Sequence, residues 1–194
     1  MPKTYTETER DNIRRDLRKA ASLCLRKYGV RHTTVDELVH MVNIPKGTFY
    51  LFYPNKESLF LDALVTFTKE EEGKYLELLE ELDENHIVTS LTTVFFEMAI
   101  SFYNSGLYRF LDDNQLAIVM RNLDETDKVR FETSRTSFIT KILDYFSIDD
   151  EDDISAFSSA FNSVFYLMLH DDEIKDFEKA LRTLIRGLVL QLVE

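Results

Sequence analysis

Residues 29–59 read GVRHTTVDELVHMVNIPKGTFYLFYPNKESL, and this stretch decides the fold of the N-terminal part of the chain. Thr34 stands before a short apolar run, and Glu37 follows it at the spacing of a capping box. The apolar residues after Thr34 recur at helical intervals, which predicts a helix over 33–42. Asn43 then breaks this helix, because asparagine tolerates the left-handed backbone of a tight turn.

A third short helix follows the turn. Pro45 suits the first position of a helix, and it predicts one over 46–52, with Asn55 as the cap of the next helix. The amphipathic pattern of 10–28 predicts a longer helix in front of the pair, which ends at Gly29. Three helices with a tight turn between the last two are typical of a helix-turn-helix head.

The rest of the chain contains few residues that interrupt helices. No proline follows Pro54, and the 194 residues include only five glycines. The sequence therefore predicts an all-α protein, in which the three-helix head is followed by a larger helical domain. The helices of that domain are expected near 56–82, 87–104, 107–121, 125–147, 152–170 and 173–193.

Charge is distributed unevenly along the chain. The net charge of the whole is −12. Residues 1–60 contain 11 Lys and Arg against 7 Asp and Glu, a net charge of +4, which leaves −16 for residues 61–194. A basic N-terminal part on an acidic body indicates a polyanion-binding module joined to a domain with a different task.

Several classes of protein are disfavoured. The polar start, Met1 to Arg15, lacks the apolar core of a signal peptide, and no stretch is apolar enough to span a membrane. Cys24 is the one cysteine and lies in an apolar stripe, so it is expected in the core. With no signal peptide, membrane span or possible disulfide, we expect a cytoplasmic protein with no membrane partner. Because no nucleophile triad, glycine-rich phosphate loop or metal-ligand cluster is present, we also expect a protein that is not an enzyme and has no cofactor or metal.

The residues of the quoted stretch are similar to the DNA-binding signature of the TetR family over about 10–60. The resemblance implies a helix-turn-helix DNA-binding domain over 1–55 and an effector-binding and dimerisation domain over 56–194. It also implies double-stranded DNA with a near-palindromic operator as partner, and a repressor rather than an activator. The positions that carry the resemblance are Gly29, Thr33–Leu38, Ile44–Tyr50 and Tyr53–Leu59.

The candidate DNA contacts lie on and around the third helix. Gly47 has no side chain, so its backbone can approach DNA closely. Lys46 and Thr48 are expected to project from the N-terminal turn, and Tyr50 offers a ring and a hydroxyl. Lys56 begins the next helix, where its charge and the free amides can hold a phosphate. The full set is Thr34, Pro45, Lys46, Gly47, Thr48, Tyr50 and Lys56.

Three positions depart from the pattern of the family. The family often has Gly at the position of Asn43 and Ala at that of Val39, and both changes fit the same turn and core. At Phe52 the family often has His or another polar residue that touches the DNA backbone. A phenyl ring cannot donate a hydrogen bond to phosphate, so no such contact is assigned to Phe52.

The acidic body contains a candidate effector site. The segment 87–104 is apolar almost all round, which is typical of a helix inside a domain and of a cavity wall. The same side chains could simply fill the core, but the family resemblance favours a cavity for a small, mainly apolar molecule. The candidate ligand-binding residues are Phe95, Met98, Ala99, Phe102, Tyr103, Phe110, Met120 and Phe138.

The last two predicted helices are suited to a second copy of the chain. Small residues recur along 152–170, an apolar stripe runs along 173–193, and Gly187 permits close approach of helices. Two such helices from each of two subunits would form a four-helix interface, and the resemblance favours this homodimer over burial within one subunit. The alternative function is a helical adaptor that binds proteins through its acidic body and has no DNA target.

Overall fold

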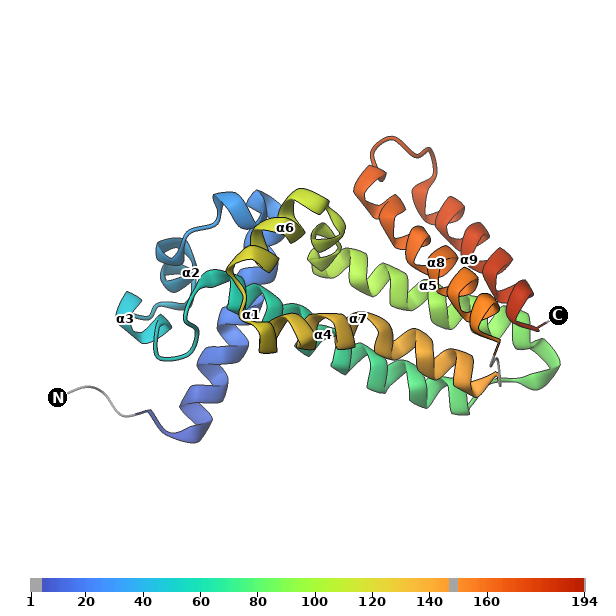
Figure 1. Ribbon diagram of the computed structural model, residues 1–194, viewed down its shortest axis with the longest axis horizontal. Coiled ribbons are helices and arrows are strands. Elements are labelled where there is room, and N and C mark those ends of the chain that lie inside the picture. The colour runs from blue at the N-terminus through green and yellow to red at the C-terminus, as the bar shows by residue number, and fades with distance from the viewer. Residues whose placement is uncertain (1–4, 147–149, 194) are drawn as a thin grey trace. The chain divides into compact units, whose positions relative to one another are not determined.

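The computed structural model describes residues 5–146 and 150–193, and the side chains in these ranges except those at 84, 111, 113, 135–139, 142–145 and 151–153. Every regular element in this part of the chain is a helix, so the all-α fold class is confirmed (Figure 1). The α-helices are α1 (Glu7–His32), α2 (Val35–Val42), α3 (Lys46–Phe49), α4 (Lys56–Glu80), α5 (Ile87–Ser105), α6 (Asp113–Asn122), α7 (Glu125–Tyr145), α8 (Glu151–Tyr166) and α9 (Phe177–Val193).

The chain packs into two compact units. The first consists of Met1–Thr66 and Ser105–Phe131, and the second of Phe67–Asn104 and Glu132–Glu194. The first unit therefore contains the predicted head together with the start of α4, α6 and the start of α7. The functional boundary expected between residues 55 and 56 is a different division, and it stays a prediction.

The first unit is built around the core that the sequence predicts for the head. Leu38 and Phe49 are fully buried, and Tyr53 is 6% exposed. The Phe49 ring lies 5.9 Å from that of Tyr53, which fixes the chain as it leaves α3. Cys24 is buried among these helices, and burial raises the pKa of its thiol, so it is the core residue that the sequence predicts.

Several helix boundaries differ from the sequence expectation because local caps decide them. The first helix begins at Glu7, where Thr6 and Glu9 form a capping box that the amphipathic pattern alone does not show. Pro45 is the N-cap of α3, not its first residue, and α3 already ends at Phe49. The last helix begins at Phe177, later than expected, because Asp176 adopts a left-handed backbone with φ of 54°.

The segment expected as one helix over 107–121 is divided. A 3-10 helix, Leu107–Leu111, comes first, and α6 begins after Asp112. The Asp112 carboxylate accepts hydrogen bonds from the amides of Asn114 and Gln115, and it thereby caps α6. The two consecutive aspartates, read from the sequence as part of one helix, therefore mark a new start.

The second unit has an aromatic core on α5. Phe95 is fully buried and packs edge-on against Phe161 of α8, with ring centroids 5.6 Å apart. Phe102 packs in the same way against Phe165 at 5.7 Å. Helices α8 and α9 run side by side (Figure 1), and the Arg182 guanidinium of α9 donates to Thr93 Oγ1 of α5 at 3.1 Å. Helices α5, α8 and α9 thus pack together in this unit.

The end of α1 contains a sharp change of backbone direction. Gly29 has φ 72° and ψ 174°, so the helix is interrupted there and resumes for a last turn to His32. The amide of Val30, which is fully buried, donates to Gln115 Oε1 at 2.7 Å. The Thr33 hydroxyl donates to the Gly29 carbonyl at 2.8 Å. Side chains therefore replace the helical hydrogen bonds that the interruption removes.

We expect Gly29→Ala to destabilise the protein by about 1–3 kcal/mol, because this backbone conformation is essentially restricted to glycine. A Cβ atom at Gly29 would also lie 2.9 Å from Gln115 Oε1. The matched control is Gly73→Ala on α4, where a Cβ meets nothing within 4 Å and helix propensity predicts a gain of about 0.5–1 kcal/mol. Thermal and urea unfolding would measure both. Equal stability of the two variants would contradict this account of Gly29.

Candidate nucleic-acid interface

Helix α2 and its caps position the turn that leads into the candidate interface. Thr34 Oγ1 accepts from the Glu37 amide at 3.2 Å, and Glu37 Oε2 accepts from the Thr34 amide at 2.8 Å. These hydrogen bonds lower the pKa of the Glu37 carboxyl. Asn43 has φ 56° and ψ 48°, so the predicted left-handed residue in the turn is confirmed. The local chemistry of the quoted stretch thus forms the helix-turn-helix.

The short helix α3 presents four of the predicted residues on the surface of the first unit. Pro45, Lys46 and Gly47 are exposed, and Tyr50, its C-cap, is 52% exposed. The Lys46 ammonium makes an exposed ion pair with Asp36 at 2.8 Å, which is readily exchanged for another anion. Because Phe49 of the same helix is fully buried, this surface is anchored to the core of the head.

Thr48 lies differently from the expectation. It is 7% exposed, and its hydroxyl is hydrogen-bonded to the hydroxyl of Tyr5 at 3.1 Å. The expected projection of Thr48 beside Lys46 is therefore wrong, because the four residues of α3 place it next to buried Phe49 and toward the N-terminal end of α1. The DNA contact assigned to it stays a prediction.

Lys56, predicted to hold a phosphate, uses its side chain within the first unit. Its ammonium donates to the carbonyls of Val30 and Thr33 at 2.7 and 2.6 Å. These carbonyls end α1, so the cation also suits the negative end of the helix dipole. Asn55, as predicted, caps α4 by accepting from the Ser58 amide at 2.8 Å. The phosphate contact of Lys56 stays a prediction, and its ammonium is already bound.

A second polar junction, centred on Asp62, was not found from the sequence. The Asp62 carboxylate accepts from the Tyr53 hydroxyl at 2.7 Å, from Arg18 of α1 at 3.2 Å and from Arg130 of α7 at 3.4 Å. Burial and this carboxylate raise the pKa of the Tyr53 phenol. Asp62 thus fixes the chain after α3 to α1 and α4. Because its partners lie far apart in the sequence, no short sequence pattern predicts these contacts.

The predicted effector residues are divided between the two units. Phe110 and Met120 belong to the first unit, where the Phe110 ring packs on Phe60 at 6.3 Å. The five predicted residues of α5 belong to the second unit, and the side chain of Phe138 lies outside the described residues. Of those on α5, Phe95, Met98 and Ala99 are buried, whereas Phe102 and Tyr103 are half-buried.

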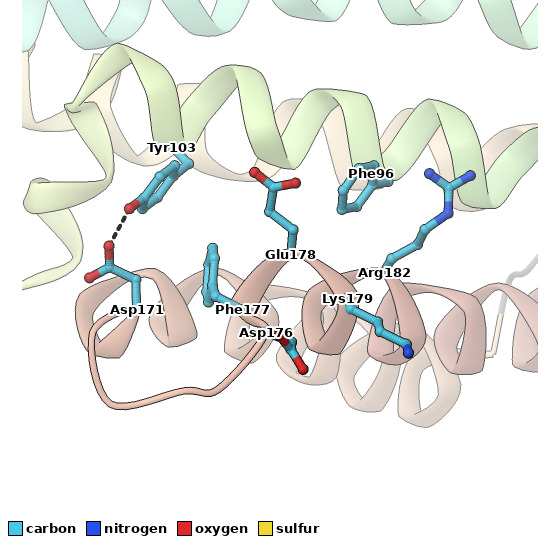
Figure 2. A pocket seen from close by; sticks show the side chains of 8 residues that line it. All are labelled: Phe96, Tyr103, Asp171, Asp176, Phe177, Glu178, Lys179 and Arg182. Atoms are coloured by element: carbon cyan, nitrogen blue, oxygen red, sulfur yellow. Dashed lines mark hydrogen bonds between the residues drawn. The ribbon is translucent and has the colours of Figure 1, made fainter.

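A surface pocket of about 800 Å³ lies between α5 and α9 (Figure 2). Tyr103 is hydrogen-bonded there to Asp171, and the Arg182 guanidinium lies over the Phe96 ring at 4.9 Å. Of the predicted effector residues, Tyr103 alone lines it among the side chains described. The sequence missed this pocket because its walls come from two helices and the turn between Asp171 and Asp176. Its lining is Phe96, Tyr103, Asp171, Asp176, Phe177, Glu178, Lys179 and Arg182.

A buried polar group also lies in the second unit. Tyr75 is 1% exposed, and burial and the neighbouring Glu71 carboxylate raise the pKa of its phenol. Glu71 Oε2 is buried and has no hydrogen-bond partner among the described side chains. Such an atom is uncommon inside a protein.

Two kinds of feature were sought throughout the described part of the chain. None of its helices combines the length and apolarity needed to cross a lipid bilayer. No three His, Cys, Asp or Glu side chains among those described gather as metal ligands would.

Comparison with known proteins agrees with the helix-turn-helix of α2 and α3. Residues 17–63 match the family model for bacterial regulatory proteins of the tetR family. The HTH-type transcriptional regulator YhgD of Bacillus subtilis (strain 168) is 37% identical over 62 residues, which are 32% of each chain. Residues 17–63 thus form a domain of the tetR family. This match spans about a third of the length of YhgD.

Solved structures share the fold over nearly the whole length of the chain. The fatty acid degradation regulator FadR from Bacillus halodurans has a TM-score of 0.66 at 13% identity, with 96% of this chain and 97% of that one covered. Thermus thermophilus FadR, a repressor solved with lauroyl-CoA, has a TM-score of 0.56 at 20% identity, with 91% and 93% covered. The family is one of transcriptional regulators and not of enzymes, and none of these likenesses favours an adaptor.

Proposed function

We propose that this tetR-family chain is a repressor that binds a near-palindromic operator as a homodimer and leaves it when a small, mainly apolar effector binds. The observation that carries the proposal is the exposure of Lys46, Gly47 and Tyr50 on α3, above a rigid core and within the basic part of the chain. Side chains on such a helix can read base edges in the major groove. Because a repressor must reach its operator on the chromosome, the proposed regulator acts in the cytoplasm.

Lys46→Ala tests the role of α3 in reading DNA. We expect it to weaken operator binding by about 1–3 kcal/mol and to relax specificity at one or two base pairs, because a lysine that contacts base edges is lost. Lys69→Ala removes the same charge from an exposed site on α4 outside the head and serves as control. Mobility shift on the DNA upstream of the gene measures both. Equal binding by the two variants would contradict the assignment of Lys46.

The proposed dimer uses outer faces of α8 and α9. In α9 the residues Leu181, Ile185 and Val189 are buried within the protomer, whereas Leu184 is 47% exposed. Gly187 lies on that exposed side, and a Cβ there would meet nothing within 4 Å. Leucine beside glycine on an open helical face suits close packing against a two-fold-related copy. Exposed small residues continue such a face on α8, namely Ala156, Ser159 and Ser163.

Leu184→Glu should convert the dimer to monomers and abolish tight operator binding, since two unpaired carboxylates would meet at the interface. Thr183→Glu adds the same charge one position away on another exposed face of α9 and should leave the dimer intact. Light scattering after size-exclusion chromatography measures the mass of each. A monomeric wild type at micromolar concentration would overturn the dimer, as would a dimeric Leu184→Glu.

The effector is proposed to bind in the second unit against α5. Phe95, Ala99 and Phe102 share the side of α5 that faces the aromatic core. Glu71 Oε2, which has no partner among the described residues, supports an effector that also carries a hydrogen-bond donor. A structural neighbour, Thermus thermophilus FadR, binds lauroyl-CoA, which contains an apolar acyl chain, so acyl compounds are the first to test.

An effector of this kind should weaken operator binding about 5–150-fold, the range of ordinary allosteric coupling. Ala99→Leu places extra carbon atoms in the buried face and should abolish the response while operator binding survives. Glu97→Gln, on the exposed side of α5, should retain both. Mobility shift with fatty acids, their CoA thioesters and aromatic amphiphiles gives the readout. If no compound changes melting temperature or DNA affinity, the effector proposal is wrong.

A further inference from the structure

Phe52, two residues beyond Tyr50, carries two arginines of α1 on its ring. The guanidinium carbons of Arg10 and Arg14 lie 5.1 and 5.5 Å from the ring centroid, within the distance of a cation–π interaction. Arg10, Arg14 and Phe52 are all half-buried. Both guanidinium groups are thus drawn to one ring at the end of the helix-turn-helix.

The N-terminal end of α1 is fixed beside α3 by Tyr5. Its hydroxyl is hydrogen-bonded to Thr48 Oγ1 at 3.1 Å, and its ring lies 6.4 Å from that of Phe52. The capping box of Thr6 and Glu9 starts the helix directly after Tyr5. The first turns of α1, which contain the two arginines, are therefore held next to the helix proposed to read DNA.

The electrostatics of this cluster favour an anion. Arg10 and Arg14 are four residues apart on one helical face, where two like charges destabilise a helix. The ring attracts the cations but does not neutralise them. Arg14 also donates to Asp11 at 3.3 Å, but the Asp11 side chain is 69% exposed, so water weakens this pair. A phosphate between the two guanidinium groups would remove their repulsion.

We propose that Arg10 and Arg14, positioned by the Phe52 ring, form a binding site for a backbone phosphate of the DNA beside α3. A guanidinium that stacks on a ring keeps its N–H edge free, and that edge matches the geometry of phosphate oxygens. Phe52 is a positioning residue here: it does not donate to phosphate but holds the two groups that do. This inference rests on the proposed DNA-binding function and adds α1 to the interface.

The test measures affinity for duplex DNA of the upstream region, and for unrelated duplex of equal length, over a range of salt concentrations. Each of Arg10→Gln and Arg14→Gln should make the slope of log affinity against log salt shallower, and the double variant should lower it by about 0.9, because the two arginines together hold one phosphate. Both should weaken the two duplexes by a similar factor, since phosphate contacts carry no sequence information. Arg15→Gln removes the same charge from an exposed neighbour on α1 and should leave the slope nearly unchanged.

Phe52 is tested by a pair of substitutions. Phe52→Leu should reproduce the shallower slope although both arginines remain, whereas Phe52→Tyr keeps an aromatic face and should restore the wild-type slope. Melting temperatures show whether each variant is folded. If Phe52→Leu does not fold, the arginine variants, which alter partly exposed side chains, still decide the matter.

The outcomes separate this inference from the function on which it rests. A wild type that binds neither duplex contradicts the proposed function itself. A wild type that binds DNA while Arg10→Gln and Arg14→Gln have the slope of Arg15→Gln overturns the phosphate site alone. If those variants bind DNA normally but lose thermal stabilisation by inorganic phosphate, the site binds a free anion, and its assignment to DNA is wrong.

Discussion

A buried backbone that changes direction must find hydrogen-bond partners for its peptide groups, and the first unit depends on how this is achieved at the end of α1. Val30 is fully buried just after the interruption at Gly29. Gln115 accepts from its amide, and Lys56 donates to its carbonyl and to that of Thr33. These three bonds tie α1 to α4 and α6, because an unpaired peptide group there would cost about 1–3 kcal/mol.

The parts of the fold that the sequence predicted correctly depend on chemistry between near neighbours. Thr34 and Glu37 cap each other, Asn43 adopts the left-handed turn, and Asn55 caps α4. Each signal lies within a few residues, so no knowledge of the tertiary fold is needed. Local patterns could not predict the contacts of Lys56, because its partners are backbone carbonyls 23 and 26 residues away. Every residue has such a carbonyl, so the sequence does not mark these two.

The candidate sites could be predicted to different degrees for a related reason. The exposed residues of α3 follow a local motif, whereas the burial of Thr48 depends on Tyr5, which is 43 residues away. In the second unit, an apolar helical face looks the same in a sequence whether it fills a core or lines a cavity. The surface pocket near Tyr103 combines side chains of α5 and α9, and neither helix predicts it alone. Tertiary packing decides such sites.

We propose that two copies of the first unit hold α3 against DNA. Hydroxyl-radical footprinting of the wild-type protein on the upstream DNA tests it most directly, because the method maps protected sugars along each strand. We expect two protected patches related by two-fold symmetry, with centres separated by one helical turn (~34–36 Å) or a longer in-phase distance. A single asymmetric patch, or no protection at concentrations where the protein is dimeric, would contradict it.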